Sequence, residues 1–498
     1  MNESRSNMQL FFTYVGSLIL MPILALGGTA AAQCCVATVT VSPGNDVQGA
    51  INSNPPGTQF NFNPGVYHNL SLVPKDYDQF ISSTPKGATL SGATLVNNFT
   101  FHTLANLWIG NIKITPTVPV GQCDSQHAGC LHSEDLFFDG VLYRRVNYQS
   151  LVVAGTWYLN YTSGNVYLAD NPTGHTIEIS TTHFAFGAGN ITSVVINGFI
   201  IEKYASPTDN GAIEGKDYFG VTTIPTFNWT VENNEIRYNH GAGIWAGDQM
   251  TISGNFTHHN GEYGIAGTGN MVSVTNNEIS FNNQVGYLYA WGGGTKFSQM
   301  GGLTVTHNNS HDNNGPGIWT DVENSGVVIA FNTTSNNKVA GIFHEISYDA
   351  QIHDNTITND GIDPRGPSSP WYGAGIMISN SSNVNVYNNT LTNCQNGIME
   401  QNKNRGNGSN GLPYETQNVR VYHNSITLSR GFAAGLIKNY PANNLMYTSW
   451  GNSFGFDTGG NPAPNTYNLS STVKFVWLLN LVPNSQMTEQ QWQALGNN

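Results

Sequence analysis

The stretches VTHNNSHDNNGPGIWTD (residues 305–321) and IAFNTTSNNKVAGIFHE (residues 329–345) are two successive copies of one repeat, and they decide the fold. In each copy an asparagine is followed by a strand-like stretch and a Gly-Ile dipeptide. Spacings of 21, 22, 31, 24, 23, 34 and 35 residues separate such asparagines, so the basic turn has about 22 to 24 residues. Self-similarity at this period is typical of a solenoid. The anchors are Asn234, Asn255, Asn277, Asn308, Asn332, Asn355, Asn389 and Asn424.

Short runs such as VSVTNNEIS (residues 272–280) alternate apolar and polar side chains at the period of a β-strand. A turn this short cannot bury its own apolar side, so neighbouring turns must stack and share a core. The anchoring asparagines are expected to hydrogen-bond one another up the stack. The pattern predicts an all-β protein with a right-handed parallel β-helix, because the signatures of leucine-rich repeats and propellers are missing.

The repeat is interrupted by segments of different character. Residues around EDLFFDGVLYRRV and TWYLNYTSGNVYLAD read as strands and hairpins, which predicts a small inserted β-sandwich. Residues 47–52 are expected to form a capping helix at the start, and Thr488 is expected to cap a short helix at the end. The predicted parts are a signal peptide (1–32), an N-terminal cap with the first turns (33–120), the insert (121–182), the main β-helix (183–446) and a C-terminal cap (447–498).

The N-terminus is typical of an export signal. Arg5 precedes the apolar run 10–26, and the three alanines 30–32 form an A-x-A cleavage site. The alternative, a permanent membrane span, is disfavoured because Pro22 and Gly27 interrupt the run. We therefore expect a secreted protein, extracellular or periplasmic, with no membrane attachment after cleavage.

Composition narrows the partners. Only 10% of residues are charged, and 31 acidic against 18 basic residues give a net charge of −13, which argues against nucleic acids and polyanionic substrates. No CxxC pair or histidine cluster indicates a metal, so no metal and no cofactor are predicted. Cys123 and Cys130 flank a short loop and are candidates for a disulfide, whereas Cys394 is expected to be buried. The role of Cys34 and Cys35 and the oligomeric state stay open.

Two acidic residues occupy the same place in the two quoted repeats. Asp321 lies 13 residues after Asn308, and Glu345 lies 13 residues after Asn332. On adjacent stacked strands they would stand about 4.8 Å apart, and carboxyl groups roughly 5 Å apart are the arrangement of a retaining glycosidase. The alternative to a catalytic role is that Asp321 and Glu345 are two surface acids that meet by chance. Aligning the turns on their Gly-Ile-like dipeptides gives the column Gly247, Thr268, Ala290, Asp321, Glu345, Ser379, Gln401 and Asn439.

Aromatic residues accompany the two acids and can stack on sugar rings. Core packing is the alternative role for those inside the repeat. Long excursions at residues 205–227, 290–302 and 361–373 are expected to shape a binding face and to bring Glu214, Lys216, Lys296, Asp363 and Arg365 to its walls, with His240 and Asp349 nearby. The predicted substrate-binding residues are Trp245, Trp291, Trp319, Phe343, His344, Tyr348 and Trp371, with Tyr372 beside the last.

The order of a β-helix start, an inserted sandwich and the motifs GIWTD and GIFHE one turn apart resembles the β-helical glycoside hydrolases of the β-xylosidase type, family 120, and family 141. The resemblance implies that Asp321 is the nucleophile and Glu345 the acid/base, with a neutral carbohydrate as substrate. Two other functions stay open. A polysaccharide lyase or uronate epimerase would use a base such as Lys203 or Arg365, and a carbohydrate-binding solenoid would have no catalytic activity.

Overall fold

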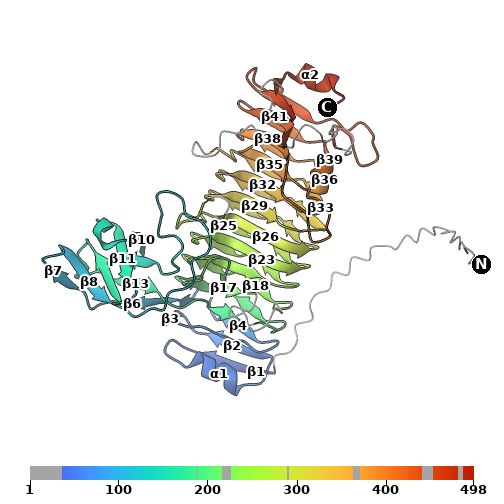
Figure 1. The fold of residues 1–498 in the computed structure, drawn as a ribbon. Coiled ribbons are helices and arrows are strands. Elements are labelled where there is room, and N and C mark those ends of the chain that lie inside the picture. The colour runs from blue at the N-terminus through green and yellow to red at the C-terminus, as the bar shows by residue number, and fades with distance from the viewer. Residues whose placement is uncertain are drawn as a thin grey trace, which may run out of the picture. The chain divides into compact units, whose positions relative to one another are not determined.

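The computed structural model describes residues 36–187, 189–215, 226–288, 291–362, 371–439, 452–479 and 486–497. The expected signal peptide, Cys34, Cys35, Lys216, Asp363 and Arg365 lie outside these residues. Within them the protein is a right-handed parallel β-helix, as predicted, whose strands stack turn upon turn into three sheets (Figure 1). No helix in these ranges is long and apolar enough to cross a membrane.

The three sheets, which we name A, B and C, follow one another in each turn from β4 onward. Sheet A comprises β1 (Ala37–Val41), β2 (Thr58–Phe62), β4 (Gln79–Ser82), β15 (Val195–Asn197), β18 (Thr230–Glu232), β21 (Thr251–Ser253), β24 (Ser273–Thr275), β27 (Thr304–Thr306), β30 (Val327–Ala330), β33 (Tyr348–His353), β36 (Ser382–Tyr387), β39 (Gln417–Tyr422) and β42 (Ser453–Phe454). Sheet B comprises β3 (Gly65–His68), β5 (Ala88–Ser91), β16 (Ile200–Glu202), β19 (Glu235–Arg237), β22 (Phe256–His258), β25 (Glu278–Ser280), β28 (Asn309–His311), β31 (Thr333–Ser335), β34 (Thr356–Thr358), β37 (Thr390–Thr392), β40 (Ser425–Leu428) and β43 (Thr466–Leu469). Sheet C comprises β14 (Phe186–Gly187), β17 (Gly211–Glu214), β20 (Ala242–Ala246), β23 (Tyr263–Asn270), β26 (Gly293–Gly301), β29 (Pro316–Asp321), β32 (Ala340–Glu345), β35 (Ala374–Ser379), β38 (Asn396–Lys403), β41 (Phe432–Asn439), β44 (Lys474–Leu479) and the antiparallel β45 (Gln486–Met487).

The predicted asparagine ladder is present between sheets A and B. Nδ2 of Asn308 donates to Oδ1 of Asn332 at 3.0 Å, and Nδ2 of Asn332 donates to Oδ1 of Asn355 at 3.0 Å. The ladder continues to Asn465, beyond the last predicted anchor. Because buried backbone groups in the corners need partners, these amides supply them turn after turn. Each amide also donates to a backbone carbonyl, as Asn308 does to Val274 at 2.9 Å.

A second ladder runs between sheets B and C, five residues after the first. It joins Asn239, Asn260, Asn282, Asn313, Asn337 and finally Asp360. Gly317, of the Gly-Ile dipeptide, lies beside this ladder, and a Cβ there would stand 2.6 Å from Nδ2 of Asn337. The glycine of the dipeptide therefore makes room for the corner amide. The next place along the ladder is Cys394, which is buried as predicted.

The inserted subdomain is one eight-stranded sheet, in the order β6 (Ala93–Leu95), β13 (Ile177–Ser180), β9 (Leu136–Phe138), β10 (Val141–Arg145), β11 (Thr156–Asn160), β12 (Asn165–Leu168), β8 (Leu107–Asn111) and β7 (Thr100–His102). A short 3-10 helix, η1 (Gln149–Leu151), precedes β11. The sheet curls around a core that includes Leu136, Ile179, Trp157 and Val166. Its first strand begins at Ala93, upstream of the predicted boundary at residue 121, because β6 pairs with β13 at the other end of the insert.

Both ends of the β-helix carry the predicted short helices. Helix α1 (Val47–Ser53) is capped by Asp46, whose side chain accepts a hydrogen bond from the backbone of Gly49. Helix α2 (Glu489–Ala494) is capped by Thr488, as predicted, and Gln491 completes a capping box. Trp492 of α2 is fully buried and contacts the ring of Phe454, which covers the last turns of the stack.

Candidate functional site

Asp321 and Glu345 are Cα partners across the parallel strands β29 and β32. Side chains alternate along each strand, so Ile318 and Ile342 enter the main core while Trp319 and Phe343 pack together in a separate cluster on the outside of sheet C. The two acids follow Trp319 and Phe343 at a spacing of two and share their face. The structure therefore places the two acidic residues opposite each other on adjacent strands, as the repeat predicted.

Two other positions in the predicted column of residues on sheet C differ from the structure. Phe297 pairs with Thr320, so the register continues to Ser298 of β26 opposite Asp321, whereas Ala290 lies outside the described residues. Gln401 pairs with Ile437 rather than Asn439. Both errors arose from aligning the turns on the wrong glycine: Gly286 precedes sheet C, and Gly435 pairs two residues beyond the dipeptide position, opposite Met399. The corrected column carries Ser298, Asp321, Glu345, Ser379 and Gln401, so the two acids remain its acidic members.

Lys296 of β26 lies against Asp321. Its Nζ atom is 3.3 Å from Oδ2 of Asp321, and it lies 4.3 Å above the ring of Trp319 and 5.7 Å from the ring of Trp291. Asp321 is buried, and its other oxygen, Oδ1, has no hydrogen-bond partner within the described part of the chain. The two oxygens of Asp321 thus differ, since Oδ2 faces an ammonium group and Oδ1 is buried without a hydrogen bond to any described residue.

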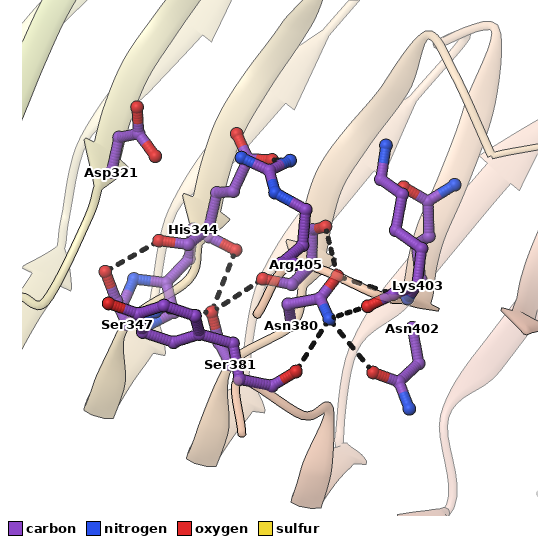
Figure 2. Close-up of polar contacts among 12 residues, drawn as sticks. Asp321, His344, Ser347, Asn380, Ser381, Asn402, Lys403 and Arg405 are labelled. Carbon is purple, nitrogen blue, oxygen red and sulfur yellow. Dashed lines mark hydrogen bonds and ion pairs between the residues drawn. The ribbon is translucent and has the colours of Figure 1, made fainter. Parts of the chain in front are cut away.

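Glu345 has a different environment. The pKa of Glu345 is raised to about 7, because burial and the charge of Asp321 together outweigh the opposing effects of Arg405 and Lys403. Nη1 of Arg405 donates a hydrogen bond to Oε1 of Glu345. Figure 2 shows Asp321 on one strand and Lys403 and Arg405 farther along the sheet. Lys403 is the last residue of β38, and Arg405 lies in the loop that follows it. One carboxylate is therefore ion-paired, and the other retains its proton to nearly neutral pH.

The aromatic residues beside the acids form a packed wall. The rings of Trp319 and Phe343 stack with centroids 5.5 Å apart, and the ring of Trp371 meets Phe343 edge-on at 5.6 Å. All three are at least nine-tenths buried, so the packing role is observed, whereas contact with a ligand stays a prediction. Nε1 of Trp319 is buried and finds no acceptor among the described residues.

Of the remaining predicted contacts, His344 and Trp245 lie away from the pair, whereas Tyr348 stands beside the loop that reaches Glu345. His344 points into the β-helix, where it is fully buried and its Nδ1 hydrogen-bonds to Thr320 at 2.7 Å, so it is removed from the candidate substrate contacts. The Ser381 hydroxyl donates a hydrogen bond to the backbone carbonyl of His344 (Figure 2). Trp245 lies on β20, three turns before β29, and packs with Tyr263. Tyr348 opens β33 of sheet A, beyond the corner from Glu345.

Three of the residues named for the cleft walls or for tuning also lie apart from the two acids. Glu214 is fully buried in β17. His240 is buried against the insert, with Nδ1 3.1 Å from Asp135. Asp349 is exposed and accepts a hydrogen bond from Asn383. Of the wall residues that the structure describes, Lys296 alone reaches the pair, because β26 is the strand directly before β29.

The loop after β38, residues 404–416, contributes groups that the repeat did not predict. Besides Arg405, its Tyr414 hydroxyl donates to Glu323 at 2.8 Å, and the Tyr414 ring stacks on Tyr348 at 6.2 Å. Ser409 donates its backbone N–H to Glu323 as well. Because this loop has no repeat period, no sequence signal placed it beside Glu345. The described residues contain no cluster of three or more His, Cys, Asp or Glu that could hold a metal.

A family model and the solved structure of XylC support the β-helix fold. Residues 219–391 match the family model for a right-handed β-helix region. The structure of XylC in complex with xylose is 15% identical, covers 87% of this chain and 82% of its own, and has a TM-score of 0.62. A mannuronan C-5 epimerase module, AlgE6 of Azotobacter vinelandii, is 12% identical over 87% of this chain and 92% of its own, with a TM-score of 0.37. No curated protein sequence matches significantly. The chain thus has a right-handed β-helix fold, which the structure of XylC shares.

Proposed function

We propose that this protein is a secreted glycoside hydrolase that cleaves a neutral polysaccharide or oligosaccharide with retention of anomeric configuration. The observation that carries the proposal is the registered pair Asp321 and Glu345 on the outer face of sheet C. Adjacent strands lie about 4.8 Å apart, which matches the roughly 5 Å between the carboxyl groups of retaining enzymes. The resemblance of GIWTD and GIFHE to the motifs of families 120 and 141 supports the same assignment, as does the fold shared with XylC.

The surroundings of each acid give it a role. Asp321 is the nucleophile: the ion pair with Lys296 holds its carboxylate in place, and this carboxylate forms a bond with the anomeric carbon. As that bond forms, the bond from the anomeric carbon to the leaving oxygen breaks, and Glu345 gives that oxygen a proton. A pKa of about 7 keeps Glu345 protonated in mildly acidic solution.

The second half of the reaction reverses the proton transfer. Glu345, now a carboxylate, removes a proton from a water molecule whose oxygen attacks the anomeric carbon. The bond between that carbon and Asp321 breaks, and both acids return to their starting protonation states. Trp319 and Phe343 form the apolar wall along one side of the pair, which excludes water from that side and presents an aromatic edge to the sugar.

One observation favours a second candidate, a lyase or epimerase acting on a uronate. Three cations, Lys296, Lys403 and Arg405, lie near the pair, and cations neutralise a uronate carboxylate. Two of them are already bonded to Asp321 and Glu345, which favours hydrolysis. Lys203, the base expected for this alternative, is bonded to Glu178 at 2.6 Å. Products that absorb in the ultraviolet, formed from a polyuronate, would identify a lyase.

The test compares three matched variants of the full-length protein on a panel of xylan, arabinan, fucosylated and glucan oligosaccharides. Asp321→Asn and Glu345→Gln remove one carboxylate each, and Glu278→Gln makes the same change at an exposed site in sheet B. Asp321→Asn is expected to abolish turnover, Glu345→Gln to lower kcat by about 10²- to 10⁴-fold, and Glu278→Gln to change nothing. Full activity in Asp321→Asn, or no cleavage of any neutral glycan by the unmodified protein, would overturn the proposal.

A further inference from the structure

A cavity of about 530 Å³ lies at the opposite end of the sheet C strands from the two acids. It is bordered by the disulfide loop of the insert, by the turn before β26, and by Asn314, Lys338 and Tyr372 just ahead of β29, β32 and β35. Its size is that of a small-molecule site. Neither Asp321 nor Glu345 contributes to it.

The disulfide loop is built onto this wall. Cys123 and Cys130 are disulfide-bonded, as predicted, and the loop between them pairs with the turn before β26. The backbone N–H of Asp124 donates to the carbonyl of Gly286 at 2.8 Å, and that of Leu288 donates to Gln122 at 2.8 Å. The insert therefore supplies one side of the cavity and the β-helix the other.

The cavity contains a buried polar atom that needs a partner. Asn283 is 3% exposed and donates from Nδ2 to the carbonyls of Tyr287 and Asn314 at 2.9 and 2.8 Å. Its Oδ1 atom accepts no hydrogen bond within the described residues. A buried amide oxygen normally has a donor, so Oδ1 of Asn283 is a polar atom in the cavity wall that lacks one in the described part of the chain. Around it stand the hydroxyl, amide and imidazole groups of Ser125, Gln126, Tyr287 and His127.

An aromatic cluster links this cavity to the two acids. Val339 and Tyr372 of the cavity wall belong to the same cluster as Trp319, Phe343 and Trp371. Val339 precedes Glu345 by six residues on one extended strand, which corresponds to roughly 20 Å at about 3.3 Å per residue. A ligand that reaches both places must run along the strands of sheet C and be longer than a disaccharide.

We infer that the cavity is a distal subsite for the sugar chain of a neutral oligosaccharide, so the protein acts on long chains in preference to disaccharides. The inference rests on the proposed function at Asp321 and Glu345. Hydroxyl groups of a sugar hydrogen-bond to the polar side chains that line the cavity, and the ring of Tyr372 gives an apolar side. A chain bound at both ends is held by more contacts than a disaccharide at the acids alone.

The test compares kcat/KM on long and short substrates from the same neutral glycan series. Ser125 is an exposed residue of the disulfide loop, and Ser125→Trp fills the cavity. The control, Thr173→Trp, adds the same ring to an exposed turn of the insert that does not line the cavity. Ser125→Trp is expected to lower kcat/KM on the long substrate by about tenfold or more, the effect of losing about 1.4 kcal/mol, and to leave the disaccharide rate unchanged. Thr173→Trp is expected to match the unmodified protein on both.

A second variant checks the wall without adding bulk. Cys123→Ser/Cys130→Ser releases the loop, and its thermal melting and disaccharide turnover show whether the enzyme is still folded. It is expected to lose the long-chain preference. An equal effect of Ser125→Trp on both substrates, or none, would overturn the subsite while the proposed hydrolysis stands. If no glycan is cleaved, calorimetric titration of the Asp321→Asn variant with the same oligosaccharides tests the subsite. Oligosaccharide binding that is weakened by Ser125→Trp supports the subsite. No oligosaccharide binding, or binding of inorganic phosphate instead, contradicts it.

Discussion

Arg405 donates a hydrogen bond to Glu345, which lies 60 residues earlier in the chain. Because a guanidinium favours the ionised carboxylate, Arg405 lowers the pKa of Glu345 against the opposing effects of burial and Asp321. The loop after β38 therefore sets the pH range in which Glu345 carries its catalytic proton.

Replacing Arg405 moves the alkaline limit of activity. Glu345 must be protonated to act as the acid, so activity falls as pH rises through its pKa of about 7. In Arg405→Gln the pKa rises, and the alkaline limb of kcat/KM is expected to move up by about one pH unit or more. Arg420→Gln, which removes an arginine bound to the carbonyl of Asp457, is the control. An alkaline limb that stays in place or moves to lower pH would contradict the role of Arg405.

Lys296 is expected to matter for turnover. Lys296→Met keeps the length of the side chain but loses the ion pair with Asp321 and the charge above the Trp319 ring. A hydrogen bond to a charged group contributes about 1.5 to 3 kcal/mol, so kcat/KM should fall by roughly 10- to 100-fold. Steady-state kinetics measure this, and Lys296→Arg should recover part of the rate. Equal rates for Lys296→Met and the unmodified enzyme would show that Asp321 acts without this partner.

His344 is expected to affect stability instead of substrate binding. It is fully buried, and burial lowers its pKa to about 3, so it stays neutral inside the β-helix. His344→Ala leaves a cavity and breaks the contact with Thr320, which should lower the free energy of unfolding by about 1 to 3 kcal/mol. KM should change little. Denaturant melts and KM values separate the two roles, and a large rise in KM at unchanged stability would restore His344 as a substrate contact.

Asp360 makes stability depend on pH. Burial raises its pKa from 3.8 to about 7, although it accepts hydrogen bonds from Asn337 and Thr334. A raised pKa in the folded state means that its contribution is complete below about pH 4 and is lost as pH rises through about 7. Asp360→Asn continues the asparagine ladder without this charge. As pH rises from 4 to 8, the free energy of unfolding of Asp360→Asn should increase by a few kcal/mol relative to that of the unmodified protein. A difference between the two proteins that does not change with pH would contradict this role of Asp360.

The regular part of the molecule could be predicted because one spacing repeats. Asn308 and Asn332 fix the register of their turns, and the same count of 13 residues aligns Asp321 with Glu345. The burial of His344 was also predictable, since it alternates with Phe343 and Glu345 along one strand. The sequence pattern failed where the period is broken. Gly286 resembled a dipeptide position, although the strand of that turn begins at Gly293.

Contacts made by loops were beyond the sequence pattern. Arg405 reaches Glu345 only because the loop after β38 folds back over sheet C, and residues 404–416 carry no repeat that indicates this. The cavity behind the disulfide loop depends in the same way on where the insert packs. The disulfide was predictable from the spacing of Cys123 and Cys130, but its position beside Gly286 was not.

The anomeric configuration of the first product tests the central claim most directly. Proton NMR recorded during cleavage of an oligosaccharide distinguishes the two anomers before they interconvert. Two displacements, the first by Asp321 and the second by water with Glu345 as base, predict a product with the anomeric configuration of the substrate. A product of inverted configuration would contradict the account, because it would require a water molecule between the two carboxylates and an attack that does not involve a bond to Asp321.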